Sequence, residues 1–411
     1  MATEQTTRNE GPVRRIFVRA RTAPATPVRR GTFTPLTSEI CRDPDRFGAL
    51  AAEWTALHRR SGPATPFQSH AWLHSWWLSY GTPGRLRVVL VRRGGTLVGA
   101  APLMLTHRPV PVLVQLGGGI SDFSDVLLDD DCVDSAAPAL AKALAVAARG
   151  AVIDLREVRP GAAAERVYEC WDGPRDRLPD SSCLELPAVP MDELLGRLSS
   201  SRAQRARAKL RKIDSLGIEA RVVPADEIPT AVERLLHLHR LQWQGRGVTT
   251  EHLSARFSAH LTRSVRSMVE HGDAMVTEFL LAGEVVAADL TLMSPQLGGG
   301  YLYGADPMLR DRKVDVATML LRESARRISA DGRPTLSMLR GNEPYKHHWR
   351  PETVGNRRLL MARGLLAPSL RLVATQAAAR DRAAVLVNER LPAMKAGLAK
   401  RTRRGEGKGK G

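Results

Sequence analysis

The chain has 411 residues, 43% of them hydrophobic and 25% charged, with a net charge of +18. It is too long for one ordinary core and too apolar for a disordered protein, so we expect two domains with tails. Residues 1–30 hold seven Lys or Arg and two Glu, and residues 361–411 hold twelve Lys or Arg and three acids. The basic charge therefore lies mostly in the tails, which favours a phosphate backbone or an anionic membrane surface as partner without specifying one.

The sequence has no signal for export, for a membrane span or for a metal. No apolar segment follows the N-terminal arginines, and no uninterrupted apolar run of about 18 residues occurs. The four cysteines are scattered and fit neither a disulfide framework nor a zinc site. Motifs of serine hydrolases, zinc proteases, P-loop enzymes and nucleic-acid-binding modules are absent. These features predict a cytoplasmic protein without a transmembrane segment or a bound metal.

The first half of the chain alternates helix and strand patterns behind a leader, residues 1–34, that we expect to be disordered and basic. Helices are predicted at 47–60, 67–77 and 134–148, the last capped by Asp134. Strands are predicted at 86–91, 97–105, 110–116, 126–128 and 151–155. Residues 157–185 are predicted to be irregular because Pro, Gly and Asp cluster there.

The second half opens with a strongly basic helix at 198–216, which is either a solvated face or a surface for RNA. Further helices are predicted at 231–244, 252–271, 315–332, where Asp315 is the N-cap, and from 368 onward. Strands are predicted at 274–281, 285–293, 301–303, 335–339 and 356–362. Residues 400–411 form a low-complexity basic tail.

Two sequence matches suggest an internal repeat. Residues 95–100 match 283–288 at an offset of 188, and Gln-Leu-Gly-Gly-Gly at 115–119 matches 296–300 at an offset of 181. The proposed caps Asp134 and Asp315 also differ by 181. The common order is a hairpin, a strand, a capped helix and a strand, which predicts two copies of one α/β unit.

Four segments resemble the GNAT superfamily of acetyltransferases, in the BioF2-like or CelD-like group related to the FemAB transferases. They are residues 66–73, 116–125, 239–247 and, most specifically, Leu-Arg-Gly-Asn-Glu-Pro-Tyr-Lys at 339–346. The resemblance implies an α/β (α+β) fold with tandem GNAT-like domains, each a mixed, mainly antiparallel sheet flanked by helices. We place these domains at 35–187 and 188–365, the second of them BioF2-like, with a helical and then basic tail at 366–411.

The resemblance also implies acyl transfer, usually from acetyl-CoA, whereas FemAB relatives take the acyl group from aminoacyl-tRNA. The pyrophosphate loop of the family reads Arg-x-x-Gly-x-Gly/Ala before a helix, and a helix N-terminus suits such a ligand. Here Arg312 and Ala317 fit that pattern, Asp315 replaces the first glycine, and Arg310 and Lys313 add positive charge. An anionic cap at 315 competes with phosphate for the same N–H groups.

The polar loop after the strand at 335–339 supplies the predicted catalytic residues. An amine that attacks a thioester must be neutral, so a carboxylate beside it can accept its proton. We predict Glu343 in this role and Tyr345 as the proton donor to the leaving thiolate. The alternative is that this loop only ties the last strands together.

Five residues are predicted to bind substrate, and they are Tyr303, Arg340, Lys346, His239 and Trp243. Tyr301 and Tyr303 alternate with Leu302, which predicts that both hydroxyls lie on one side of the strand. His239 and Trp243 are four residues apart on one helix face. Core packing is the alternative role for these aromatic residues. Asp122 and Asp125 either cap turns or point into a cleft between the domains.

Three functions remain open on these grounds. The first is an acyl-CoA-dependent N-acyltransferase that uses acetyl-CoA and acts on an amino group of a sugar, a peptide or a cell-envelope precursor. The second is a GNAT-fold binding protein without catalysis, which the aspartate at 315 favours. The third is aminoacyl-tRNA-dependent transfer, in which the basic helix at 198–216 binds RNA.

Overall fold

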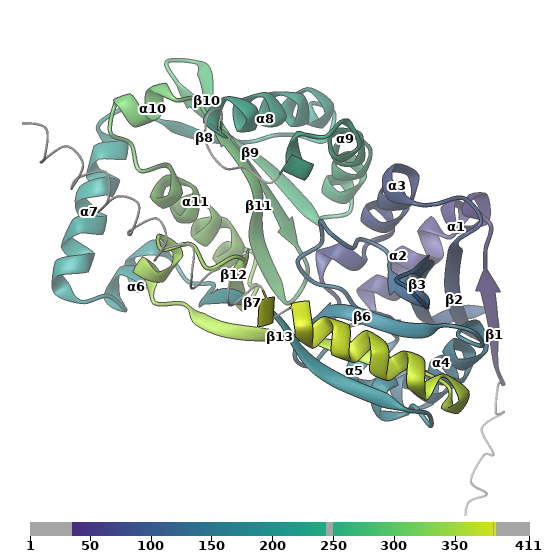
Figure 1. Cartoon of the computed structure of the whole chain (residues 1–411). Coiled ribbons are helices and arrows are strands. Elements are labelled where there is room, and N and C mark those ends of the chain that lie inside the picture. Colours follow the sequence, from purple (N-terminus) through teal and green to yellow (C-terminus); the bar gives the residue numbers. More distant parts are fainter. Residues whose placement is uncertain (1–34, 244–249, 381, 384–411) are drawn as a thin grey trace, which may run out of the picture. The chain divides into compact units, whose positions relative to one another are not determined.

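The structure, a computed structural model, describes residues 35–243, 250–380 and 382–383. The described residues belong to one compact unit that begins at Pro35 (Figure 1). The predicted disordered leader and most of the predicted basic tail lie outside the described residues.

Thirteen strands of the described chain form one sheet in the order β1-β2-β3-β4-β6-β13-β7-β12-β11-β10-β9-β8, with β5 beside β3. The strands are β1 (Leu36–Cys41), β2 (Leu86–Arg93), β3 (Thr96–His107), β4 (Pro111–Gln115), β5 (Leu127–Leu128), β6 (Val152–Val158), β7 (Arg175–Pro187), β8 (Glu219–Val222), β9 (Ala274–Leu281), β10 (Glu284–Met293), β11 (Leu297–Ala305), β12 (Thr335–Arg340) and β13 (Glu352–Met361). Only the pairs β4–β6 and β11–β12 of this sheet are parallel. The prediction of a mixed, mainly antiparallel sheet flanked by helices is therefore confirmed.

The helices pack on both faces of the sheet (Figure 1). They are α1 (Pro44–Ala49), α2 (Ala51–Arg59), α3 (His70–Tyr80), α4 (Val133–Ala147), α5 (Ala163–Glu169), α6 (Met191–Gly196), α7 (Ser200–Asp214), α8 (Ile228–Trp243), α9 (Ala255–Glu270), α10 (Met308–Asp311) and α11 (Val316–Ala330), followed by a helix at 367–380. Within the described residues, none of these helices has both the length and the apolar character needed to cross a lipid bilayer.

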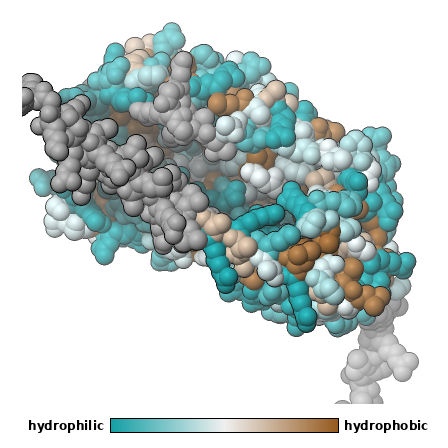
Figure 2. Space-filling model, viewed as in Figure 1, coloured by the Kyte–Doolittle hydropathy of each residue, from teal (hydrophilic) through white to brown (hydrophobic). Residues whose placement is uncertain are grey.

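The apolar core continues from one half of the chain into the other. The largest cluster joins α1, α2 and α3 of the first half to α8 and α9 of the second. A separate cluster buries the opposite face of the second half under α7 and α11. On the face seen in Figure 2 the visible surface is mostly hydrophilic, and hydrophobic residues gather over the helix at 367–380.

The two halves build their first hairpin in the same way. The turns at 94–95 and 282–283 have both central residues at positive φ, 54° and 88° in the first and 52° and 84° in the second, as a type I′ turn requires. Each hairpin then shifts register at one extra residue, Val98 in β3 and Val286 in β10. These positions differ by 188, the offset of the first sequence match.

In each half, counting from the first strand of the hairpin, the third and fourth strands are parallel to one another. They are β4 and β6 in the first half, where the short β5 is not counted, and β11 and β12 in the second. Residues 112–114 pair with 152–154 in the first half, and residues 297–299 pair with 335–337 in the second. The equivalent residues therefore differ by 185 in the third strand and by 183 in the fourth. The match of the two Gln-Leu-Gly-Gly-Gly runs at an offset of 181 is wrong, because the first run follows β4 and the second leads into β11.

Two further sequence expectations fail in the first half. Residues 157–185 are not irregular, because they hold α5 and most of β7, a strand of 13 residues. The first eight residues of β7 are Arg-Asp-Arg-Leu-Pro-Asp-Ser-Ser, and this mostly polar composition hid the strand. Asp134 is not the cap of α4 either; the N-cap is Cys132, and Asp134 lies in the first turn, where it pairs with Arg166 at 3.0 Å.

The halves exchange strands near the middle of the sheet. β13 comes last in sequence, yet it lies between β6 and β7, and β7 pairs with β12 of the second half. The sheet therefore continues across residue 187, and the division of the chain at that point stays a prediction.

Candidate functional site

The strands β11 and β12 separate soon after they pair. Their described register covers Leu297–Gly299 against Thr335–Ser337, after which β11 runs on to Ala305 and β12 to Arg340. Leu339 has a positive φ of 56°, and its N–H donates to the Ser337 hydroxyl at 3.1 Å. The described pairing of β11 with β12 ends beside this bend, and we call the stretch from Gly300 onward, where the two strands are no longer paired, the gap between β11 and β12.

The helix α11 begins beside this gap, and Asp315 is its N-cap as predicted. The Thr318 N–H donates to the Asp315 carboxylate at 2.9 Å, and Lys209 of α7 pairs with the same carboxylate at 2.6 Å. Burial opposes the charged form, but these two hydrogen bonds hold the pKa of Asp315 below its usual value. The cap is therefore an ionised carboxylate that is already bonded to the Thr318 N–H and to Lys209.

A cavity of about 290 Å³ lies between α7, the start of α11 and the loop after β12. Its first wall carries the cations Arg202, Arg205 and Lys209, and its second wall carries Ala317 and Thr318. The third wall comes from Tyr345, His348 and Trp349. The cavity therefore combines positive charge, a helix N-terminus and a phenol.

The loop at 340–346 is held closed by a buried lysine. Lys346 is 6% exposed, and its ammonium donates to the Arg340 carbonyl at 2.8 Å and pairs with Glu343 at 2.9 Å. The Glu343 side chain is 50% exposed. Tyr345 is 41% exposed, and partial desolvation of its hydroxyl, with smaller contributions from Tyr303 and Glu343, raises the pKa of Tyr345 above its usual range. Tyr345 therefore carries its proton at neutral pH.

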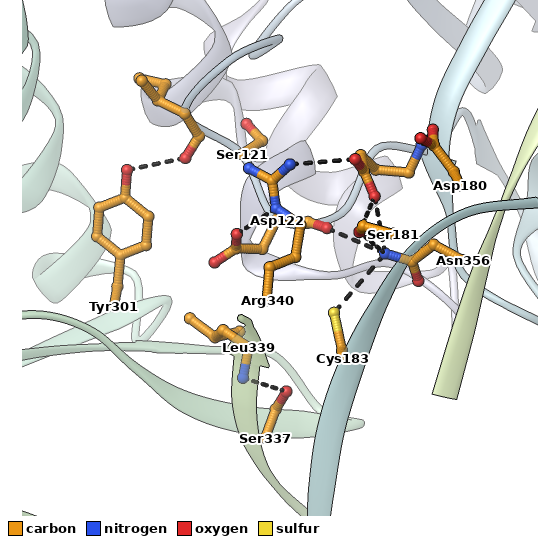
Figure 3. Close-up of polar contacts among 12 residues, drawn as sticks. Ser121, Asp122, Asp180, Ser181, Cys183, Tyr301, Ser337, Leu339, Arg340 and Asn356 are labelled. Carbon is orange, nitrogen blue, oxygen red and sulfur yellow. Dashed lines mark hydrogen bonds and ion pairs between the residues drawn. The ribbon is translucent and has the colours of Figure 1, made fainter. Parts of the chain in front are cut away.

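Arg340 does not belong to the lining of this cavity. Its side chain lies in a polar cluster where the two halves meet (Figure 3). Its guanidinium donates to Asp122 at 2.6 Å and to Glu157 at 3.1 Å. The Asn356 amide of β13 donates to the other oxygen of Glu157 at 3.1 Å, and Ser181 also donates to Glu157. Burial raises the pKa of Asp122, and Arg340 acts against that shift. The cluster joins charged and polar groups from four strands, β6, β7, β12 and β13, and from the loop at Asp122.

The backbone is strained on both sides of this cluster. Glu157 and Leu339 have φ of 54° and 56°, values that a non-glycine residue adopts only at a cost on the order of 1–3 kcal/mol. The Tyr301 hydroxyl donates to the Ile120 carbonyl at 2.8 Å, which adds another contact between the halves. Strain beside buried charges is typical of a functional site.

A register shift between Leu290 and Thr291 breaks the alternation of side chains along β11. Tyr301 therefore packs in the same core cluster as Leu302, whereas Tyr303 packs in the cluster under α11. The expectation that both hydroxyls lie on one side of the strand is wrong for this reason. His239 is 4% exposed, and its Nδ1 bonds to the Tyr303 carbonyl at 2.7 Å; burial lowers its pKa.

Comparison with protein families gives a match in this part of the chain. Residues 200–347 match the model described as the acetyltransferase (GNAT) domain. The second half of the chain carries a GNAT acetyltransferase domain. Within it lie α7, the gap between β11 and β12, and the loop at 340–346. A comparison with curated protein sequences finds no match.

Solved structures resemble the chain over most of its length. FemX superposes with a TM-score of 0.54 at 13% identity, covering 79% of this chain and 98% of its own. A conserved protein of unknown function from Bacteroides thetaiotaomicron VPI-5482 gives a TM-score of 0.53 at 14% identity, covering 77% of this chain and 97% of its own. At these identities the likeness shows a shared fold, which agrees with the resemblance to the FemAB-related group and extends beyond the GNAT domain to the first half.

The structure brings some of the predicted site residues together and separates others. Ala317 and Tyr345 line the cavity, whereas Arg310, Arg312 and Lys313 are exposed around the end of α10 and do not belong to its lining. Arg340 serves the cluster between the halves, and Lys346 holds the loop. The side chain of Trp243, the last residue of α8, lies outside the described part of the chain.

Several residues of the GNAT domain site were missed from the sequence. The sequence predicts the helix of Arg202, Arg205 and Lys209 to be either a solvated face or a surface for RNA, and not the wall of a cavity. The spacing of three and four residues nevertheless places these cations on one side of α7. Glu157 and Asn356 carried no signal, because their roles depend on pairing between the halves. Asp289, a lone acid within an apolar strand pattern, could have been found and was not.

Proposed function

We propose that the chain transfers an acyl group, acetyl in the first instance, from acyl-CoA to an amino group of a sugar, a peptide or a cell-envelope precursor. The observation that supports this most is the cationic cavity at the start of α11, beside the gap between β11 and β12. A thioester in that gap meets unpaired strand backbone, which can donate hydrogen bonds to the developing oxyanion. The amine acceptor then approaches the thioester carbon across the gap.

The residues of the cavity fit the phosphates of CoA in a particular way. Arg202 and Arg205 of α7 are exposed and point their charge at the cavity. Asp315 already occupies an N–H group of the helix N-terminus and neutralises Lys209. We therefore expect the phosphates to bind mainly to the two arginines, with Arg310, Arg312 and Lys313 as a more distant source of positive charge.

The loop at 340–346 supplies the groups predicted for the chemistry. Tyr345 keeps its proton at neutral pH and lines the cavity, so it can donate that proton to the leaving thiolate. Glu343 remains the predicted proton acceptor of this loop. Arg340 and Lys346 shape the loop from behind, and Tyr303 and His239 fix the strand beside it. These four residues and Trp243 are the ones predicted to bind the amine acceptor.

The common geometry of the two halves supports a tandem origin. The same hairpin turn, the same extra residue and the same parallel third and fourth strands occur in each. We therefore propose two GNAT-like units, at 35–187 and 188–365, that share one sheet and act in the cytoplasm.

Aminoacyl-tRNA-dependent transfer is the second candidate, and a further feature of α7 favours it. Arg207, Arg211 and Lys212 are exposed on this helix and do not belong to the cavity lining. An RNA backbone could follow them toward the cavity. The aspartate cap at the start of α11 also favours a donor other than CoA, or a domain that only binds.

Calorimetry with acetyl-CoA tests the proposal. We expect a micromolar Kd, weakened on the order of tenfold to a hundredfold in Arg202→Ala/Arg205→Ala, because each arginine gives charge-assisted hydrogen bonds to phosphate. The matched control is Arg207→Ala/Arg211→Ala on the same helix, which we expect to bind as the wild type does. Labelled acetyl-CoA with a panel of amino sugars and dipeptides then identifies the acceptor by its mass shift. No heat at millimolar acetyl-CoA contradicts the proposal and favours the binding protein, and tRNA binding lost in the control variant favours the second candidate.

A further inference from the structure

Asp289 is a carboxylate in the middle of an otherwise apolar strand. It is 5% exposed, and the sheet register places it opposite Thr277 of β9 and Tyr303 of β11. Its neighbours Ala288 and Leu290 pack in the core under α8 and α9, so Asp289 lies on the face covered by α11. An ionisable group in such a place is costly unless it is paired or has a function. The hydrogen bond described for it comes from the Thr291 hydroxyl at 2.7 Å.

The carboxylate is nevertheless reachable from the gap between β11 and β12. Gly300 is exposed, and a Cβ at that residue would lie 3.4 Å from Oδ1 of Asp289. Gly300 is also the first residue of β11 beyond the described pairing with β12. A glycine at this point keeps the space beside the carboxylate open to a ligand. Asp289 therefore borders the position where the gap begins.

Two side chains, Tyr303 and Tyr345, link the same carboxylate to the cavity. Directly opposed residues of antiparallel strands have Cα atoms about 4.5–5.5 Å apart, and Asp289 is opposed to Tyr303. Tyr303 lies close enough to Tyr345 to influence its titration, and Tyr345 lines the cavity. The line from the cavity through Tyr345 and Tyr303 thus ends at Asp289.

We propose that Asp289 accepts the proton of the attacking amine in the acyl transfer proposed above, on which this inference rests. The neutral amine nitrogen forms a bond to the thioester carbon while the bond from that carbon to sulfur breaks. The proton lost from nitrogen passes to the Asp289 carboxylate, and the thiolate leaves with the electron pair of the broken bond. Asp289 then releases its proton to water through the opening over Gly300.

The environment of Asp289 suits this task better than that of Glu343. Burial raises the pKa of Asp289 to about 6, and the bond from Thr291 limits the shift. At pH 7.5 it is therefore ionised and still basic enough to take a proton. Glu343 is half exposed, and Lys346 already neutralises it.

The pH dependence of kcat tests the assignment on the full chain, with acetyl-CoA and the acceptor found among the amino sugars and dipeptides. For the wild type we expect kcat to fall below about pH 6. In Asp289→Asn we expect kcat at pH 7.5 to fall about 10²- to 10⁴-fold, the acidic limb to disappear and the Kd for acetyl-CoA to stay unchanged. Glu323→Gln is the matched control, since Glu323 is also a buried carboxylate on the α11 side but is paired with Arg326 and Arg327. It should keep both kcat and the limb.

The outcomes separate this inference from the function on which it rests. Transfer by the wild type together with full activity of Asp289→Asn contradicts the role of Asp289 alone, as does loss of the acidic limb in Glu343→Gln. No binding of acetyl-CoA and no transfer by the wild type contradict both proposals. If Asp289→Asn does not fold, Thr291→Val replaces it. Removing that hydrogen bond raises the pKa of Asp289 further, so the limb must move to higher pH, and an unmoved limb overturns the assignment.

Discussion

The hairpins of the two halves have the same backbone geometry but carry different side chains at equivalent positions. With the same turn and the same extra residue, each position of β3 corresponds to the position 188 residues later in β10. Asp289 then corresponds to Ala101, and Thr291 to Leu103, both of which are fully buried. One half therefore uses these positions for packing alone, and the other places an acid and its hydroxyl partner there. The fold tolerates the acid but does not require it, which favours a functional reason for it.

At the junction between the halves, equivalent positions contact each other directly. The ends of the equivalent strands β6 and β12 meet there through their side chains. Glu157 and Arg340 each come five residues after the first parallel pair of their half, Val152 and Thr335, and they bond to one another at 3.1 Å. Each fourth strand has a left-handed non-glycine residue at or beside this position. The strain occurs in both halves, whereas the charges differ and complement each other. The junction therefore depends on side chains that neither half could satisfy alone.

Breaking the junction should give the largest effect. Arg340→Met leaves Asp122 and Glu157 without their cation, and removing one partner of a buried charged cluster costs about 3–5 kcal/mol. We expect this loss in the free energy of unfolding measured with urea at pH 7.5. Arg363→Met, at an exposed arginine with an ordinary extended backbone, is the control and should stay within about 0.5 kcal/mol of the wild type.

Further substitutions in the Arg340→Met variant show how much of its lost stability comes from uncompensated charge and how much from lost packing. Adding Asp122→Asn and Glu157→Gln to Arg340→Met removes the uncompensated charges and should recover part of the lost stability. A loss below about 1 kcal/mol for Arg340→Met alone would mean that the junction is held by other contacts.

Making the hairpins alike should give the next largest effect. Ala101→Asp puts a carboxylate at the position of Asp289, but Leu103 offers no hydroxyl to it. We expect the variant to lose about 3 kcal/mol of unfolding free energy at pH 7.5 and less at pH 5, where the new group gains its proton. Ala101→Asn, which carries no charge, is the control for size. An equal loss at both pH values would show that volume, rather than charge, decides the cost.

The contribution of Asp289 to the free energy of unfolding should depend on pH. Its pKa is raised from 3.8 to about 6 in the folded chain, so the folded state binds the extra proton between these values. The stability from this group is fully present below pH 3.8 and is lost as pH rises through about 6, a change of at most about 3 kcal/mol. Urea unfolding of the wild type and Asp289→Asn from pH 4 to pH 8 should show the variant gaining relative to the wild type across this window. A constant difference between them would mean that the carboxylate is already ionised at pH 4.

The sequence predicted the local features of both halves and missed those that need both halves at once. The hairpins, the cap at Asp315 and the helix it begins follow from residues close in the chain, and the structure confirms them. The long strand β7 was missed because its partners β12 and β13 come more than 140 residues later. The cluster around Arg340 was missed for the same reason, since Asp122, Glu157 and Asn356 carry no common spacing.

The candidate site was predictable in part. The loop at 340–346 was found from its composition, and the cations of α7 were visible as a stripe whose use could not be inferred without the position of α11. The roles within that loop depend on which way each side chain turns. Arg340 and Tyr345 are five residues apart and serve opposite sides of the loop, and no pattern in the sequence gives that difference.

The two equivalent helices, α4 after β4 and α11 after β11, differ in how their N-termini are capped. Substitutions at these caps should give the smallest change in stability. The Asp315 carboxylate bonds to the Thr318 N–H, whereas Cys132 at the N-cap of α4 makes no side-chain cap bond and Asp134 is exposed in the first turn. We expect Asp315→Ala to cost about 1 kcal/mol of unfolding free energy and Asp134→Ala less than about 0.5 kcal/mol.

Asp315→Ser sharpens the same contrast, because serine keeps a cap oxygen and removes the negative charge. It should unfold like the wild type and bind acetyl-CoA more tightly, since Lys209 is then free for phosphate and no anion competes at the helix N-terminus. Calorimetry of the wild type and this variant measures that gain directly. Unchanged affinity would show that the phosphates do not reach the start of α11 and bind at Arg202 and Arg205 alone.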